Sequence, residues 1–69
     1  MKTTLETITG ELDHLKERLE FFKEKDAKEV RIKLEYMYVN KLQHMKHYAT
    51  LEQREPYIDF IVRYYGWKR

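Results

Sequence analysis

Two histidines three residues apart, His44 and His47, come nearest to forming a metal site in this chain. They share one face if their segment is helical, and imidazole is a good ligand for zinc or nickel. A closed zinc site takes four ligands and a catalytic one takes three, whereas the chain has no cysteine and only one other histidine, His14. We therefore expect a solvated helix surface here, with no metal and no cofactor.

Catalytic chemistry is not indicated either. The chain has no serine and no cysteine, and its threonines stand in no activating context. Its carboxylates are interspersed with lysines, as in Glu24 and Lys28, whose four-residue spacing is typical of ion pairs on a helix surface. Gly10 and Gly66, the two glycines, cannot form a phosphate-binding loop. We expect no catalytic residues and no enzyme.

The most unusual segment is the last one, where residues 57–69 hold five aromatic and three cationic side chains. Aromatic rings and arginine suit protein hot spots and stacking on nucleic-acid bases alike. Part of the segment should pack onto the remaining chain as a third layer: Tyr57, Phe60, Ile61 and Tyr64. The others are predicted to form an exposed partner-binding surface: Arg63, Tyr65, Trp67, Lys68 and Arg69.

These side chains need a scaffold, and the first half of the chain predicts a helix with a coiled-coil-like seam. Its apolar residues are spaced alternately by three and four: Leu5, Ile8, Leu12, Leu15, Leu19 and Phe22. Thr3 and Glu6 have the spacing of a capping box, which predicts a helix start near Thr4. So narrow a seam requires a partner helix.

A turn is predicted after this helix, because residues 23–29 are polar except for Ala27. The apolar stripe resumes at Val30, rotated by about 80°. Asp26 and Glu29 are spaced as a helix cap, so a second helix should begin at Ala27. The rival is one continuous rod, since no glycine or proline occurs between Glu11 and Glu55.

The second helix has two apolar faces. A broad one holds Val30, Leu34, Met37, Tyr38, Leu42, Met45, Tyr48 and Ala49. The other face carries Ile32, Tyr36 and Val39, which we predict to contact a partner or a second copy. The alternation of apolar residues leaves a second interpretation open, in which strands near 29–39 and 57–65 pair in an α+β fold.

Pro56 predicts a break followed by a short third helix from Pro56 to Tyr65, with Gly66 as its C-cap. The predicted fold is all-α: one small domain over residues 1–69, made of a helical hairpin and a short third C-terminal helix. With 69 residues and no disulfide, such a domain has a small core, and self-association is expected to supplement it.

The function expected from these features is that of a small regulatory or adaptor protein. It would bind an unidentified protein partner, and it would form a homodimer through the seam and the patch of Ile32, Tyr36 and Val39. The lack of cysteine fits the cytoplasm, and there is no continuous apolar stretch of the kind that a signal peptide or a membrane span requires, so no membrane partner is expected.

The alternative is a small nucleic-acid-binding module. Its phosphate contacts would come from six cations, and Tyr65 or Trp67 would stack on bases. These cations are Lys41, Lys46, Arg54, Arg63, Lys68 and Arg69. A net charge of only +2, with acidic residues among the cations, makes this the weaker hypothesis.

Overall fold

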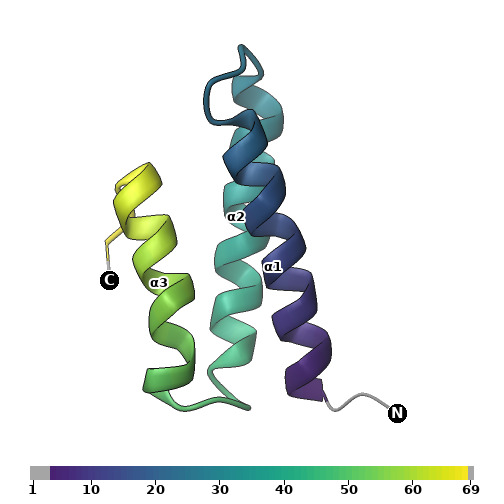
Figure 1. The fold of residues 1–69 in the computed structure, drawn as a ribbon, viewed down its shortest axis with the longest axis vertical. Coiled ribbons are helices and arrows are strands. Elements are labelled where there is room, and N and C mark those ends of the chain that lie inside the picture. Colours follow the sequence, from purple (N-terminus) through teal and green to yellow (C-terminus); the bar gives the residue numbers. More distant parts are fainter. Residues whose placement is uncertain (1–3, 69) are drawn as a thin grey trace.

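The computed structural model, which describes residues 4–68, consists of three helices joined by short turns (Figure 1). These are α1 (Thr4–Phe22), α2 (Lys28–Met45) and α3 (Leu51–Tyr65). Helices α1 and α3 run in one direction and α2 runs in the other. The all-α prediction, a hairpin with a third helix, is confirmed. Within residues 4–68 there is no strand, so the α+β alternative is wrong.

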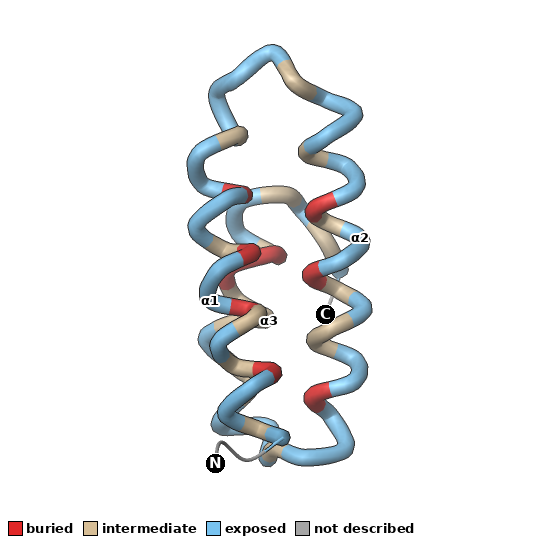
Figure 2. Tube along the Cα trace, turned by 90° about the vertical axis from the view of Figure 1, so that its right-hand side faces the viewer, coloured by how far each residue is buried: buried red, intermediate tan, exposed pale blue. Residues whose placement is uncertain are grey.

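The seam of α1 is buried inside the protein. Leu12 and Leu19 have no exposed surface, and Ile8 and Leu15 are nearly as deeply buried. The buried positions of α1 and α2 face each other across the hairpin (Figure 2). Because the chain's own helices cover the seam, the prediction that the seam pairs two copies is wrong.

The turn between α1 and α2 is where the polar stretch predicted it, which excludes the continuous rod. The predicted Asp26 cap is wrong, because the N-cap residue is Ala27 and no side chain caps this end. Helix α1 begins at Thr4, while Thr3 of the predicted capping box lies outside the described residues.

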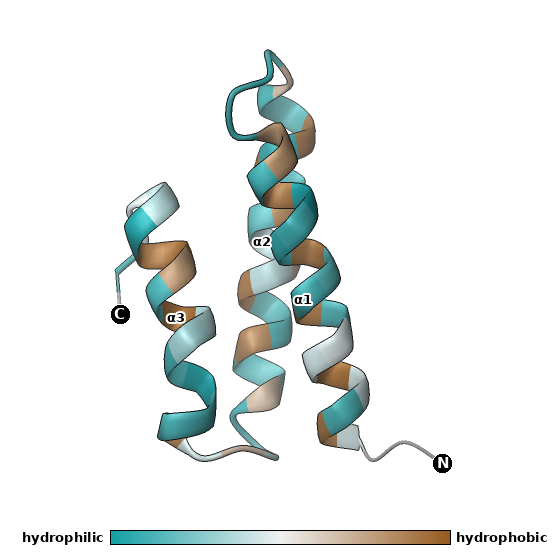
Figure 3. Ribbon diagram, in the orientation of Figure 1, coloured by the Kyte–Doolittle hydropathy of each residue, from teal (hydrophilic) through white to brown (hydrophobic). Residues whose placement is uncertain are grey.

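Helix α2 is buried along a narrower stripe than the broad face predicted. Leu34, Tyr38 and Met45 are its buried residues, whereas Met37 is 52% exposed. The helix ends at Met45, so Tyr48 lies in the following turn and is also largely exposed. Apolar residues alternate with polar ones along all three helices (Figure 3).

Helix α3 begins at Leu51, five residues before the predicted start at Pro56. A capping box explains the difference: the Thr50 hydroxyl accepts from the Gln53 N–H (3.2 Å), and the Gln53 side chain accepts from the Thr50 N–H (3.0 Å). Pro56 therefore stands inside the helix. Pro56 and Glu52 are both exposed, so water can reach the Glu52 carbonyl that loses its helical bond.

Tyrosine hydroxyls hold α3 on the hairpin. Tyr38 of α2 is fully buried, and its hydroxyl donates to the Tyr57 carbonyl of α3 at 2.6 Å. The Tyr57 hydroxyl donates to Asp13 of α1 at 2.9 Å. Phe60 and Ile61 complete the contact as buried residues. The predicted third layer is thus present, although its fourth member, Tyr64, is 45% exposed.

The C-terminal ends of the parallel helices α1 and α3 stabilise each other. The Tyr65 hydroxyl donates to the Leu19 carbonyl in the last turn of α1 at 2.6 Å. In return, Lys23 donates to the Tyr64 carbonyl in the last turn of α3 at 3.0 Å. Both carbonyls belong to the set that a helix leaves without an internal partner, and the lysine charge also favours a helix C-terminus.

Removal of the Tyr38 hydroxyl tests its role in docking α3. We expect Tyr38→Phe to lower the free energy of unfolding by about 1 kcal/mol, the net value of one internal hydrogen bond. The measurement is urea denaturation followed by circular dichroism, with Tyr48→Phe as the control because Tyr48 lies exposed in a turn. Equal stability of the two variants would contradict the assignment.

Alkaline pH should destabilise the protein through its tyrosines. Burial, aided by the bond to Asp13, raises the pKa of Tyr57 from 10.0 to about 12. Burial also raises the pKa of Tyr38 and of Tyr65. A pKa raised in the folded state favours the neutral hydroxyl there, so this stability is complete below about pH 10 and is lost as the pH rises toward about 12.

Thermal unfolding measured from about pH 9 to about pH 12 checks this dependence. We expect Tyr57→Phe to lose stability less steeply over this range than the wild type. Identical slopes would show that the tyrosine is not responsible.

Candidate functional site

A surface groove of about 430 Å³ lies between α2 and α3. We call it the α2–α3 groove. Its apolar lining consists of Val39, Leu42, Leu51, Ile58, Ile61, Val62 and Trp67. On α3, Leu51, Ile58 and Val62 are spaced by seven and four residues, which places them in one stripe along the helix. The core-facing residues Tyr57 and Phe60 form a separate stripe, so α3 is apolar on two sides.

Cations surround this apolar lining. Lys46 lies just after α2, Arg54 is on α3, and Lys68 follows Trp67 in the C-terminal tail. The groove has one acidic residue, Glu55, and one neutral polar residue, Gln43. Lys46 and Lys68 are exposed, and Arg54 is half-buried, with its Nε donating to the Thr50 carbonyl at 3.3 Å. The groove therefore combines an apolar lining with a net positive edge.

Trp67 closes one end of the groove by folding back onto α2. Gly66 has φ 71°, a left-handed conformation that glycine adopts without strain, and its N–H donates to the Val62 carbonyl at 3.0 Å. This confirms the predicted C-cap. The Trp67 Nε1–H donates to Glu35 of α2 at 2.8 Å, and the indole meets the Tyr36 ring edge to face, with centroids 5.5 Å apart.

Several residues predicted to bind a partner meet at this end. Val39, Trp67 and Lys68 line the groove itself. Tyr36 lies beside it, 58% exposed and in contact with the indole, and Ile32 is exposed one helical turn before Tyr36. Two segments that the sequence separates by some thirty residues thus form one surface.

The other three residues predicted to bind a partner do not join this surface. Arg63 is exposed, but it stands about 160° around the helix from Ile61, on the outer side of α3. Tyr65 points inward, since its hydroxyl bonds to Leu19, and it is partly buried. Arg69 lies outside the described residues.

Sequence reasoning missed most of the groove on α3. Leu51 and Ile58 were not predicted as site residues, and Arg54 was named only as a phosphate contact of the nucleic-acid alternative. Leu51 and Arg54 precede Pro56, where the helix was expected to start, so their position on α3 was not predicted. The signal that could have found them is the Thr50 to Gln53 spacing, the same type of capping box as that proposed for Thr3 and Glu6.

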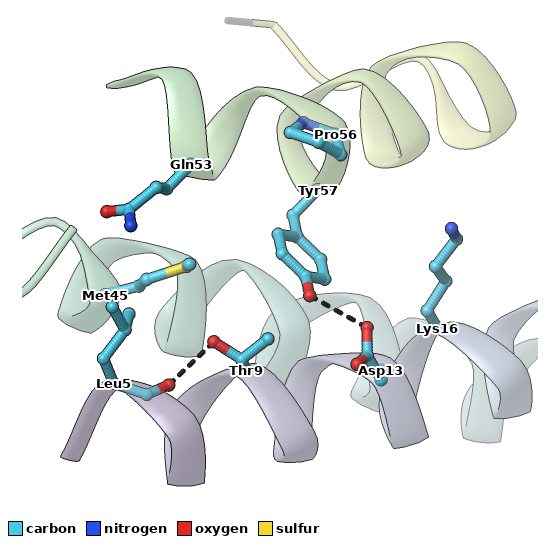
Figure 4. Close-up of a pocket in the computed structure, with 8 residues that line it drawn as sticks. All are labelled: Leu5, Thr9, Asp13, Lys16, Met45, Gln53, Pro56 and Tyr57. Carbon is cyan, nitrogen blue, oxygen red and sulfur yellow. Dashed lines mark hydrogen bonds between the residues drawn. The ribbon is translucent and has the colours of Figure 1, made fainter. Parts of the chain in front are cut away.

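A second groove, of about 380 Å³, lies between α1 and α3 (Figure 4). In the close-up, Tyr57 reaches down from α3 to Asp13, and its hydrogen bond spans the space between the helices. Lys16, Thr9 and Gln53 make much of the remaining lining polar. Because this groove is bridged by a structural contact, the α2–α3 groove is the better candidate site.

Within residues 4–68, no three side chains of the histidine, cysteine or carboxylate type are grouped closely enough to hold a metal ion. His44 and His47 are both exposed, with ring centroids 6.5 Å apart. None of the helices, in the part of the chain that the structure describes, combines the length and apolar character needed to cross a membrane.

Comparison of the chain with family models, with curated proteins and with solved structures gives no match.

The docking of the tail can be tested at Trp67. We expect Trp67→Phe to lower the free energy of unfolding by about 1 to 2 kcal/mol, because it removes a hydrogen bond to the largely buried Glu35 carboxylate. Urea denaturation followed by circular dichroism measures the effect. Lys68→Gln is the matched control at the next, exposed position, and a Trp67→Phe variant as stable as this control would refute the docking contact.

Proposed function

We propose that this protein is a small non-enzymatic regulator or adaptor that binds a segment of a partner protein in the α2–α3 groove. The observation that carries the proposal is the second apolar stripe of α3. Leu51, Ile58 and Val62 face no further helix among residues 4–68, and together with Val39 and Trp67 they line an open groove. A partner that covered these residues would gain the free energy of removing them from water.

The groove also has the composition of a protein-binding site. Interfaces are enriched in tryptophan, tyrosine and arginine; Trp67 and Arg54 line the groove, and Tyr36 lies beside it against the Trp67 ring. Trp67 is held by its bond to Glu35 and by the Tyr36 ring, and Arg54 is held by its bond to the Thr50 carbonyl, so little ordering would oppose association. A protein of this kind acts by occupying a surface of its partner.

The partner that we propose is a different protein rather than a second copy. The seam of α1, through which a homodimer was expected to form, is buried in the chain. Two copies would have to pair through exposed residues such as Ile32, Tyr36 or Leu51 instead. The lack of cysteine is consistent with a reducing compartment, and we place this function in the cytoplasm.

Nucleic-acid binding is the second candidate, because three of the six predicted phosphate contacts line the groove beside Trp67: Lys46, Arg54 and Lys68. The other described cations are elsewhere. Lys41 forms an ion pair with Glu11 of α1, and Arg63 is on the outer side of α3. Three dispersed charges around an apolar lining favour a protein segment over a phosphate backbone.

Capture from a lysate of the native host tests the proposal when groove variants are compared. We expect the tagged wild type to retain a stoichiometric protein after nuclease treatment, and Leu51→Asp to lose it. Leu51 is 56% exposed, so the substitution places a charge in the groove without disturbing the core.

Phe21→Asp is the matched control, since Phe21 is exposed to a similar degree and lies outside the groove. Equal capture by the wild type and Leu51→Asp would refute the groove as the binding site. Loss of all captured protein on nuclease treatment would favour the second candidate.

A further inference from the structure

We infer that the groove binds an amphipathic helix that carries acidic residues on its flanks. This inference rests on the proposed function and specifies the chemistry of the partner segment. It follows from three properties of the groove: its lining, its length and its charge.

The lining favours a helix over an extended segment. The groove walls are two helices, whose main-chain groups are already bonded, and the lining is apolar apart from the residues at its edges. An extended peptide would bring unpaired N–H and C=O groups to this surface, where no sheet edge receives them. A helix satisfies its own main chain and presents side chains alone.

The length of the groove limits the segment that it can hold. On α2 the lining runs from Val39 to just beyond the helix end at Lys46, and on α3 it runs from Leu51 to Val62. At 1.5 Å per residue these stretches span about 10 to 17 Å, which corresponds to about two or three helical turns. The partner would therefore place apolar residues at positions i, i+3 or i+4, and i+7.

The charge of the groove selects acidic flanks. Lys46 and Arg54 lie toward the α2–α3 turn, and Lys68 lies at the other end, beside Trp67. Glu55 is the single acidic residue among them. Acidic residues at both ends of the bound helix would face these cations, whereas a basic helix would be repelled.

Trp67 allows direct measurement, because it is the only tryptophan of the chain and lines the groove. The probe is a synthetic peptide of about four helical turns, with leucines along one face and glutamates on both flanks. Its twin has lysine in place of every glutamate. Each is titrated into the full chain while the emission of Trp67 is recorded, at low and at high salt.

We expect the acidic peptide to shift the emission and to bind at least about tenfold tighter than the basic twin at low salt, with the difference shrinking as salt screens the charges. The double variant Lys46→Glu, Lys68→Glu should reverse the preference. Lys33→Glu is the control, because Lys33 is an exposed lysine of α2 outside the groove. Leu51→Asp should weaken both peptides.

Other outcomes would overturn the inference and are distinguishable from failure of the proposed function. Equal binding of both peptides, lost in Leu51→Asp, would keep the groove as a protein site but exclude the acidic partner. Binding of neither peptide would also exclude the acidic helix, and the lysate comparison of Leu51→Asp with Phe21→Asp would decide the groove independently.

Two further experiments test whether nucleic acid or a second copy of the chain occupies the groove instead. If an oligothymidylate shifts the emission and displaces the acidic peptide, the groove binds nucleic acid and the inference is wrong. If light scattering without peptide shows a dimer that Leu51→Asp dissociates, the occupant is a second copy and the inference is equally wrong.

Discussion

The hydrogen bond from Tyr38 to the Tyr57 carbonyl is the contact on which the arrangement of the three helices depends. Tyr38 has no exposed surface, and its ring packs against Phe60 with centroids 5.7 Å apart. A hydroxyl in this position must find a partner, because an unpaired polar group costs free energy when it is buried. The distance and rotation of α3 bring the Tyr57 carbonyl to this hydroxyl, so the ring is buried with its polar group satisfied.

Aromatic side chains therefore act as spacers between α3 and the hairpin. Tyr57 and Tyr65 extend from α3 to polar groups of α1, and Lys23 covers the Tyr65 ring at 5.3 Å while bonding to the last turn of α3. These contacts are long and directional, in contrast to the close packing of leucines between α1 and α2. They hold α3 at its middle and at its C-terminal end and leave open grooves on its two sides.

The groove beside α2 results from this spacing together with the C-terminal turn. The left-handed Gly66 reverses the chain, and Trp67 then reaches Glu35 and the Tyr36 ring. Without this turn the groove would be open at that end, and the indole would be fully in water. Trp67 thus completes the fold and also supplies the anchor of the proposed interface.

The sequence by itself determined the helices, because their signals are local: the seam of α1, the polar turn and the glycine cap each depend on neighbours within a few residues. The start of α3 at Leu51 was not predicted, because Pro56 is a strong signal for a helix start and the capping box of Thr50 and Gln53 is a weaker one. Nor could the sequence show that the apolar seam of α1 packs against the other helices of the same chain. Only the tertiary structure brings Val39 to Trp67 and turns Tyr65 inward. Two effects decide which apolar stripe of one helix packs against which stripe of another: the fit of the side chains, and the need of buried tyrosine hydroxyls for hydrogen-bond partners on a neighbouring helix.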